Sequence, residues 1–110
     1  MTRMWMVEPK ILCRQHLLGE HKELHQLVGA ILKGRMNVIK GHARLGQVEC
    51  DSIYDRHKEL VQEMHRRGFN HKSPLPEFEE LSCGQVDRKA ALEELLQRCP
   101  RCRSRYLTCV

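Results

Sequence analysis

The clearest periodicity in the chain belongs to QHLLGEHKELHQLVGAILK, residues 15–33. Its apolar residues recur every three or four positions, which is the spacing of one face of an α-helix. Gly34 follows directly, at the position where glycine often caps the end of a helix. The stretch therefore predicts a long amphipathic helix with one buried face. That face carries Leu17, Leu24, Leu27, Val28 and Ile31.

The sequence downstream predicts a second long helix. Asp51 and Ser52 are favourable N-cap residues, and Gly68 stands where this helix should end. Between the two helices, residues 37–49 indicate a looser region with one or two short helices. The stretch after the second helix, residues 67–76, contains two prolines and predicts a rigid loop. The stripe of the second helix is Ile53, His57, Leu60, Val61 and Met64.

A third helix is expected from about Val86 to Arg98, and Pro100 should stop it. No segment alternates convincingly like a strand, and no repeat is present. We therefore expect an all-α fold, a compact single domain of three main helices over residues 1–110, with a Cys-rich basic segment at 99–110. The core positions expected in the third helix are Ala90, Leu92, Leu95 and Leu96.

The composition fits a soluble globular protein with a polyanionic partner. Of the 110 residues, 41% are hydrophobic and 30% are charged, so the chain can bury a core. No apolar run reaches the roughly 18 residues that a membrane helix needs. The net charge of +5 is spread along the chain and favours a nucleic-acid-binding face. The opening residues lack the apolar core of a signal peptide, so we expect a cytoplasmic protein of a bacterial, archaeal or virus-infected cell.

The polar face of the first helix carries candidate catalytic residues. His16, Glu20 and Glu23 can form one ridge, because residues three, four and seven apart lie on the same side of a helix. A carboxylate on this ridge can act as a general acid or base if its surroundings tune its pKa. The alternative is an ordinary solvated face. His21 and His25 could together hold a metal ion, but two ligands do not make a site.

The six cysteines leave two interpretations open. Without an export signal, we expect reduced thiols instead of a disulfide framework. Cys99 and Cys102 have the Cys-x-x-Cys spacing of half a zinc site, which Cys83 and Cys109 could complete. The other interpretation is a set of unligated thiols around a basic DNA-binding turn. We therefore expect no cofactor, with structural zinc at these four cysteines as the alternative.

Three blocks of the sequence are similar to one known family. The first consists of Met1-Thr2-Arg3, Gln15-His16-Leu17, Glu20 and Glu23-Leu24, and it runs without a gap to about Gln26. The second extends from Glu59-Leu60 to Arg67-Gly68-Phe69-Asn70, and the third is the helix ending at Gln97-Arg98. Together these blocks resemble the phage-type pyrimidine-dimer DNA glycosylases, also called endonuclease V.

The resemblance implies a helical, single-domain enzyme that removes the 5′ pyrimidine of an ultraviolet-induced cyclobutane dimer and then breaks the backbone by β-elimination. Its nucleophile would be the α-amine of Thr2, exposed when the initiator Met is removed, and its essential carboxylate would be Glu23. The partner would be damaged double-stranded DNA, and we expect a monomer that binds no membrane. Arg3, Gln15, His16 and Lys22 fall on DNA-contacting positions of the family, and charge and polarity add Arg14, Glu20, Gln26, His57, Asn70, His71 and Lys72 as candidates.

This chemistry suits an α-amine. A Schiff base with sugar C1′ needs an unprotonated amine, and an α-amine has a pKa near 7.7–8.0 against about 10.4 for lysine. At pH 7 roughly one α-amine in eight is neutral, against about one lysine in 2,500. A nearby cation such as Arg3 would lower the pKa of the Thr2 amine further. Glu23 would stabilise the cationic iminium and move protons during ring opening and elimination.

The chain also departs from the family. Arginine is usual in the family at the positions of Lys22 and Gln26. Lys22 keeps the positive charge but lacks the bidentate guanidinium, and Gln26 has no charge. The aromatic-rich segment that contacts the lesion in long members is replaced by residues 99–106, where Tyr106 is the one aromatic residue. Two alternatives follow: the same chemistry on another damaged base or on abasic sites, and a non-catalytic basic DNA-binding module.

Overall fold

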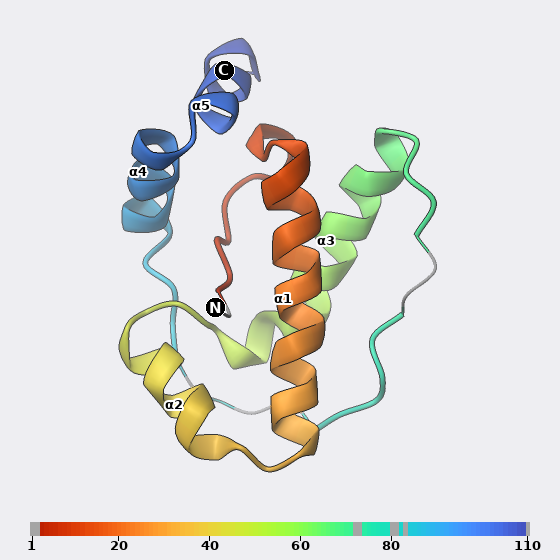
Figure 1. Cartoon of the computed structure of the whole chain (residues 1–110), viewed down its shortest axis with the longest axis vertical. Coiled ribbons are helices and arrows are strands. Elements are labelled where there is room, and N and C mark those ends of the chain that lie inside the picture. Colours follow the sequence, from red (N-terminus) through yellow and green to blue (C-terminus); the bar gives the residue numbers. More distant parts are fainter. Residues whose placement is uncertain (1–2, 72–73, 80–81, 83, 110) are drawn as a thin grey trace.

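The computed structural model describes residues 3–71, 74–79, 82 and 84–109. These residues contain helices and no strand, which confirms the all-α fold (Figure 1). None of the described helices is long and apolar enough to span a bilayer. The helices are α1 (Arg14–Leu32), α2 (Met36–Arg44), α3 (Ile53–Arg66), α4 (Arg88–Arg98) and α5 (Pro100–Cys109), with 3₁₀ turns η1 (Pro9–Ile11) and η2 (Cys50–Ser52).

Helix α1 is the centre of the fold and confirms the helix expected at residues 15–33. Figure 1 shows it between α3 on one side and the N-terminal segment, residues 3–13, on the other, with α2 across its far end. Leu17, Leu24 and Val28 are fully buried, as the periodicity predicts. The apolar stripe of α3 faces α1, so the two long helices bury their apolar faces against each other.

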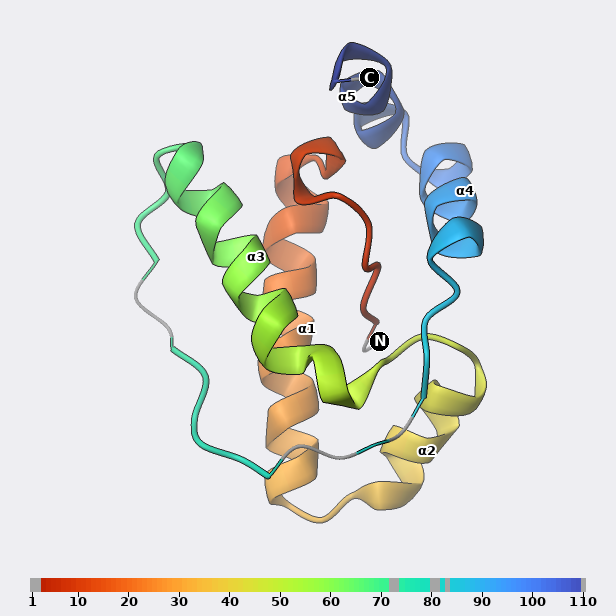
Figure 2. The same cartoon turned by 180° about the vertical axis from the view of Figure 1, so that it is seen from behind.

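The N-terminal segment, residues 3–13, is part of the core and not a frayed end. In both views it runs between α1 and α4 (Figures 1 and 2). Met4 and Trp5 are almost fully buried. The backbone N–H of Met4 donates to the carbonyl of Gln47 at 2.7 Å, and Arg56 donates to the carbonyl of Val7 at 2.7 Å. Hydrogen bonds and apolar burial therefore both fix the beginning of the described chain.

The C-terminal half corrects the expectation of three main helices. Pro100 ends α4 but also begins α5, because a proline at the first helical position gives up only an N–H that has no partner within the helix. Between the two helices, Cys99 is extended, with φ −118° and ψ 106°. The expected core position in α4 is also shifted by one residue, since Ala90 is exposed and Ala91 is buried. Asp87 caps α4 by accepting a hydrogen bond from the backbone N–H of Ala90 at 3.1 Å.

Ser52 is the N-cap residue of α3, as predicted, but its side chain does not cap the helix. Its hydroxyl donates instead to the buried carboxylate of Glu49. The same carboxylate accepts hydrogen bonds from the backbone N–H of Val86 and from Arg88, both at 3.1 Å. Burial alone would raise the pKa of Glu49, but these hydrogen bonds outweigh it and lower that pKa. Glu49 thereby ties the start of α3 to the start of α4.

The long connection from α3 to α4 passes along the outer side of α3 and down to the lower end of α1 (Figure 2). Tyr54 stacks on Phe78 with ring centroids 4.5 Å apart, which attaches this connection to α3. At Gly84, the connection packs closely against Val48. Gly84 has φ +79°, and a Cβ atom built there would lie 2.4 Å from the carbonyl oxygen of Val48. Only glycine fits this conformation without a shift of the backbone.

Candidate active site

Glu23 is half-buried on α1 and lies beside the N-terminal segment. Its Oε2 accepts a hydrogen bond of 3.2 Å from the backbone N–H of Arg3. Burial raises the pKa of Glu23 above its ordinary value, against the opposing effect of the Arg3 N–H. Thr2, the expected nucleophile, lies outside the described residues. Arg3 is the residue that follows it, so the described chain begins in contact with the expected carboxylate.

The side chain of Arg3 is held in place by two neighbours. Its guanidinium forms an ion pair with Glu94 of α4 and lies over the ring of Trp5, 3.9 Å from the centroid. Arg98, also on α4, approaches the same ring at 5.7 Å. Because cations attract the faces of aromatic rings, Trp5 and the two arginines form one packed group. This group connects the start of the described chain to α4.

Glu20 does not join Glu23 on a solvent-facing ridge. Both Glu20 and Arg56 of α3 are about 1% exposed, and they form a two-point ion pair, with Arg56 Nη2 donating to Glu20 Oε1 at 2.9 Å. A buried carboxylate with a bound guanidinium has no surface to offer to DNA. The expectation that Glu20 contacts DNA is therefore replaced by a structural role that links α1 to α3. The signal that the sequence lacked was the position of Arg56.

The other expected DNA contacts on α1 fall into two groups. Gln15, Lys22 and Gln26 are exposed, and their spacing of seven and eleven residues places them on one side of α1, next to Glu23. Arg14 is exposed on another side of the helix, 5.4 Å from the ring centroid of Phe69. In the connection after α3, Asn70 is exposed, whereas Lys72 lies outside the described residues.

His16 belongs to a compact group with three cysteines. Its Nδ1 lies 3.1 Å from the Sγ of Cys13 and 3.6 Å from the Sγ of Cys102, and the Sγ atoms of Cys13 and Cys99 are 3.8 Å apart. The three thiols are buried and His16 is half-buried. Burial raises the pKa of the Cys102 thiol to about 12. This group was not predicted from the sequence, although Cys13-x-x-His16 has the same spacing as Cys99-x-x-Cys102.

Cys83 and the side chain of Cys109 lie outside the described residues, so their predicted part in a zinc site stays a prediction. Cys13, Cys99 and Cys102 are free cysteines, as expected for reduced thiols. Cys50 is disulfide-bonded, so the expectation of a free thiol is wrong at that position.

Four histidines form a second group, on another side of α1. His21 and His25 of α1 meet His57 of α3 and His71 of the following connection, and one nitrogen from each lies within 4.8 Å of the others. Burial, followed by the neighbouring imidazoles, lowers the pKa of His21 to about 4. His57 and His71 are candidates for DNA contacts, and that assignment stays a prediction. The structure brings them together with His21, which lies on α1 roughly 200° around the helix axis from Glu23.

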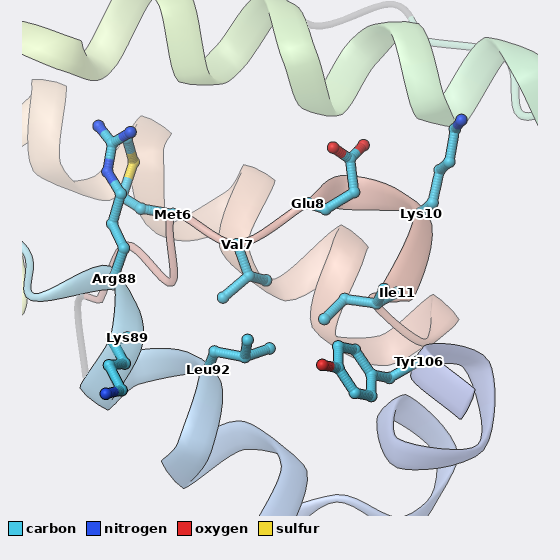
Figure 3. A pocket seen from close by; sticks show the side chains of 9 residues that line it. All are labelled: Met6, Val7, Glu8, Lys10, Ile11, Arg88, Lys89, Leu92 and Tyr106. Atoms are coloured by element: carbon cyan, nitrogen blue, oxygen red, sulfur yellow. The ribbon is translucent and has the colours of Figure 1, made fainter. Parts of the chain in front are cut away.

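A pocket of about 540 Å³ opens between the N-terminal segment, α4 and α5 (Figure 3). Val7, Ile11, Leu92 and Tyr106 form its apolar walls, and Figure 3 shows basic side chains from both ends of the chain at its rim. The pocket does not contain Glu23. On α4, Leu92 faces the pocket. Glu94, which pairs with Arg3, is two residues further along and lies on the other side of the helix.

Comparison with known proteins assigns the family. The family model described as pyrimidine dimer DNA glycosylase matches residues 2–77, about two thirds of the chain. No curated protein and no solved structure matches the chain. The matched residues include Glu23 and end before α4, so Cys99 and Cys102 lie beyond the match.

Proposed function

Because the chain belongs to the pyrimidine dimer DNA glycosylase family, we propose that it removes a damaged pyrimidine from double-stranded DNA and then nicks the strand as an AP lyase. Thr2 supplies the attacking α-amine and Glu23 the carboxylate. The observation that carries this proposal is the hydrogen bond from the backbone N–H of Arg3 to Glu23. It holds the residue next to Thr2 against a half-buried carboxylate, as amine chemistry at that position requires.

In the proposed reaction, the Thr2 amine nitrogen attacks C1′ of the damaged nucleotide. The bond from C1′ to the base breaks, and its electron pair leaves with the base, which takes up a proton. The nitrogen then loses a proton, the C1′–O4′ bond breaks, and O4′ takes up a proton as the ring opens, which leaves a protonated imine. Removal of a C2′ proton breaks the C3′–O bond and releases the downstream strand with its 5′ phosphate. Water finally hydrolyses the imine and frees the amine.

Glu23 has two tasks in this scheme. As a carboxylate it stabilises the positive charge of the iminium, and this attraction is stronger in a half-buried site than in water. As a proton carrier it serves ring opening and the removal of the C2′ proton. The raised pKa of Glu23 favours the second task, since a carboxyl group exchanges protons best when its pKa approaches the working pH.

The exposed side of α1 next to Glu23 is the proposed DNA-binding face. Gln15, Lys22 and Gln26 lie there, and Lys22 supplies a charge for a phosphate. Such contacts position the enzyme without reading sequence. The base must leave the duplex to react, and damage lowers the cost of that step.

The test is borohydride trapping with untagged protein on a duplex carrying one cyclobutane thymine dimer, with an abasic duplex alongside. We expect a covalent adduct and a nicked strand on both substrates. Glu23→Gln should lower nicking by a factor of about 10² to 10⁴, the usual contribution of general acid–base catalysis, while DNA binding persists. Glu93→Gln, at an exposed carboxylate of α4, is the matched control and should change neither.

The location of the adduct separates the alternatives. Peptide mapping should find the sugar remnant on the amine of Thr2, and intact mass should show that Met1 is absent. A trapped lysine would contradict the assignment of Thr2. An adduct on the abasic duplex alone would replace the dimer by another damaged base, and no adduct on either duplex would leave only a DNA-binding module.

A further inference from the structure

The group of Cys13, His16, Cys99 and Cys102 has the composition and the spacing of a zinc site. It consists of two short motifs, Cys13-x-x-His16 at the start of α1 and Cys99-x-x-Cys102 at the junction of α4 and α5. Paired ligands separated by two residues are typical of structural zinc sites. The fold brings these two motifs together although 86 residues separate Cys13 from Cys99.

Three distances between ligand atoms lie close to those around one tetrahedral ion, and all four ligand atoms lie within 4.8 Å of one another. A zinc ion about 2.3 Å from sulfur and about 2.0–2.1 Å from nitrogen gives tetrahedral edges of roughly 3.8 Å between sulfurs and roughly 3.5 Å between sulfur and nitrogen. The Sγ atoms of Cys13 and Cys99 are 3.8 Å apart. His16 Nδ1 lies 3.1 and 3.6 Å from the two sulfurs that it approaches.

We propose that Cys13, His16, Cys99 and Cys102 bind one structural Zn²⁺ ion. Four protein ligands close the coordination sphere and leave no position for water or substrate, so this ion is structural and not catalytic. Backbone N–H groups already point at the sulfurs: Cys13 donates to Cys102 Sγ at 3.2 Å, and Cys102 donates to Cys99 Sγ at 3.4 Å. Such donors stabilise thiolates and orient them toward a metal.

The proposed ion adds to the contacts that hold α5 in place. This helix has ten residues, a length that is marginal for an isolated helix in water. Cys102 is its one buried side chain among those that the structure describes. A metal at Cys102 joins α5 to α1 and, through His16, to Trp5, whose ring lies edge-on to the imidazole at 5.8 Å. The proposed site thus connects the C-terminal helix to the segment that contacts Glu23.

The first test is metal analysis of untagged wild-type protein, followed by replacement of the metal with Co²⁺. We expect zinc at this site and, with Co²⁺, the thiolate charge-transfer band and strong visible bands of a tetrahedral site. Cys102→Ser and His16→Asn should each release one metal ion, and they should speed trypsin cleavage at the arginines of α5, because cleavage requires the helix to open locally. His42→Asn, at a half-buried histidine on α2 outside both groups, should change neither result. Wild-type protein without zinc and without a thiolate–Co²⁺ band would overturn the proposal.

The four histidines form a second candidate metal site, which rests on observations separate from those for the cysteine group. The Nε2 atoms of His21 and His71 are 3.0 Å apart, and all four imidazoles approach within 4.8 Å. Among the described residues, no hydrogen-bond partner reaches the buried Nε2 of His25. Buried nitrogens normally have a partner, and in the tautomer protonated at Nδ1 this atom offers its lone pair to a metal ion. The geometry points to a second Zn²⁺ that ties His71, and with it the connection after α3, to α1 and α3.

The stoichiometry distinguishes the two sites. Wild-type protein should carry about two zinc ions per chain, one for each tetrahedral set. His71→Asn should lower this to about one and leave the thiolate–Co²⁺ band unchanged, because an all-imidazole site has no sulfur. Cys102→Ser should remove the band and keep the other ion. One zinc ion in the wild type that is lost in Cys102→Ser would overturn the histidine site alone, whatever the variants do to nicking.

Discussion

Replacing Arg56 by methionine tests the most buried polar contact of the fold. Arg56 and Glu20 are each about 1% exposed, and the guanidinium makes two hydrogen bonds to Glu20 and a third, of 2.7 Å, to the carbonyl of Val7. Arg56→Met leaves a buried carboxylate without a cation, which costs about 3–5 kcal/mol. It also leaves the Val7 carbonyl without its donor, which adds about 1–3 kcal/mol.

The expected loss is therefore roughly 4–8 kcal/mol, comparable with the whole stability of a domain of this size. The double variant Glu20→Leu/Arg56→Met removes both charges and should recover most of the loss, because only the Val7 carbonyl remains unsatisfied. Urea unfolding measures both values. Trp5 is the single tryptophan and is 5% exposed, so its fluorescence reports the N-terminal segment, and circular dichroism reports the helices.

Two results would refute this reasoning. If Arg56→Met unfolds at the same urea concentration as the wild type, the ion pair contributes no stability. If the double variant is as unstable as the single one, the loss comes from packing around Arg56 and not from the unpaired charge of Glu20. The coupling energy of the double-mutant cycle separates these cases.

Three further predictions concern the frame and the DNA-binding face. Gly84→Ala should destabilise the fold by at least about 1–3 kcal/mol, from the positive φ and the contact with Val48, whereas Gly29→Ala, with open space and a helical φ, should stabilise α1 by up to about 1 kcal/mol in thermal unfolding. Burial would raise the pKa of Glu49, but its hydrogen bonds lower that pKa below the unfolded value. The ionised carboxylate therefore adds to the free energy of unfolding above about pH 4–5, and this stabilisation is lost as the pH falls further. The stability difference between the wild type and Glu49→Gln should shrink from pH 7 to pH 3, and a difference that grows would contradict this sign. Lys22→Ala should weaken DNA binding at low salt and lower the salt slope by about one unit, and an unchanged slope would remove Lys22 from the phosphate contacts.

The sequence predicts the parts of this fold that depend on local patterns. The periodicity of α1 and the Gly68 stop of α3 are local signals, and the structure confirms both. The role of Glu20 depends on a residue of another helix, so a polar position that looked solvent-facing is buried. Pro100 shows a different limit, since proline both ends one helix and is well suited to begin the next.

The candidate site also contains residues that the sequence predicts and residues that only the fold brings together. Glu23 could be proposed from the resemblance, because the residue and its spacing from the start of the chain are both visible in the sequence. The two metal-ligand groups depend on contacts between segments that are distant in the chain. A Cys-x-x-Cys motif indicates half of a metal site, but the sequence does not show which residues form the other half. The pairing of Cys13 with His16 was visible, and only the fold shows that it meets Cys99.

The contacts of the N-terminal segment with the two C-terminal helices also bear on the order in which the fold forms. Arg3 pairs with Glu94, Cys13 donates to Cys102, and Arg105 donates to the carbonyl of Lys10, a contact across 95 residues. Contacts between segments so distant in the sequence cost more loop-closure entropy than local ones, so we expect them to form late in folding. Until they form, Trp5 lacks its contact with Arg98 of α4. Helices α1 and α3 lie closer together in the sequence, so they can pair first and offer the surface on which the distant contacts then form.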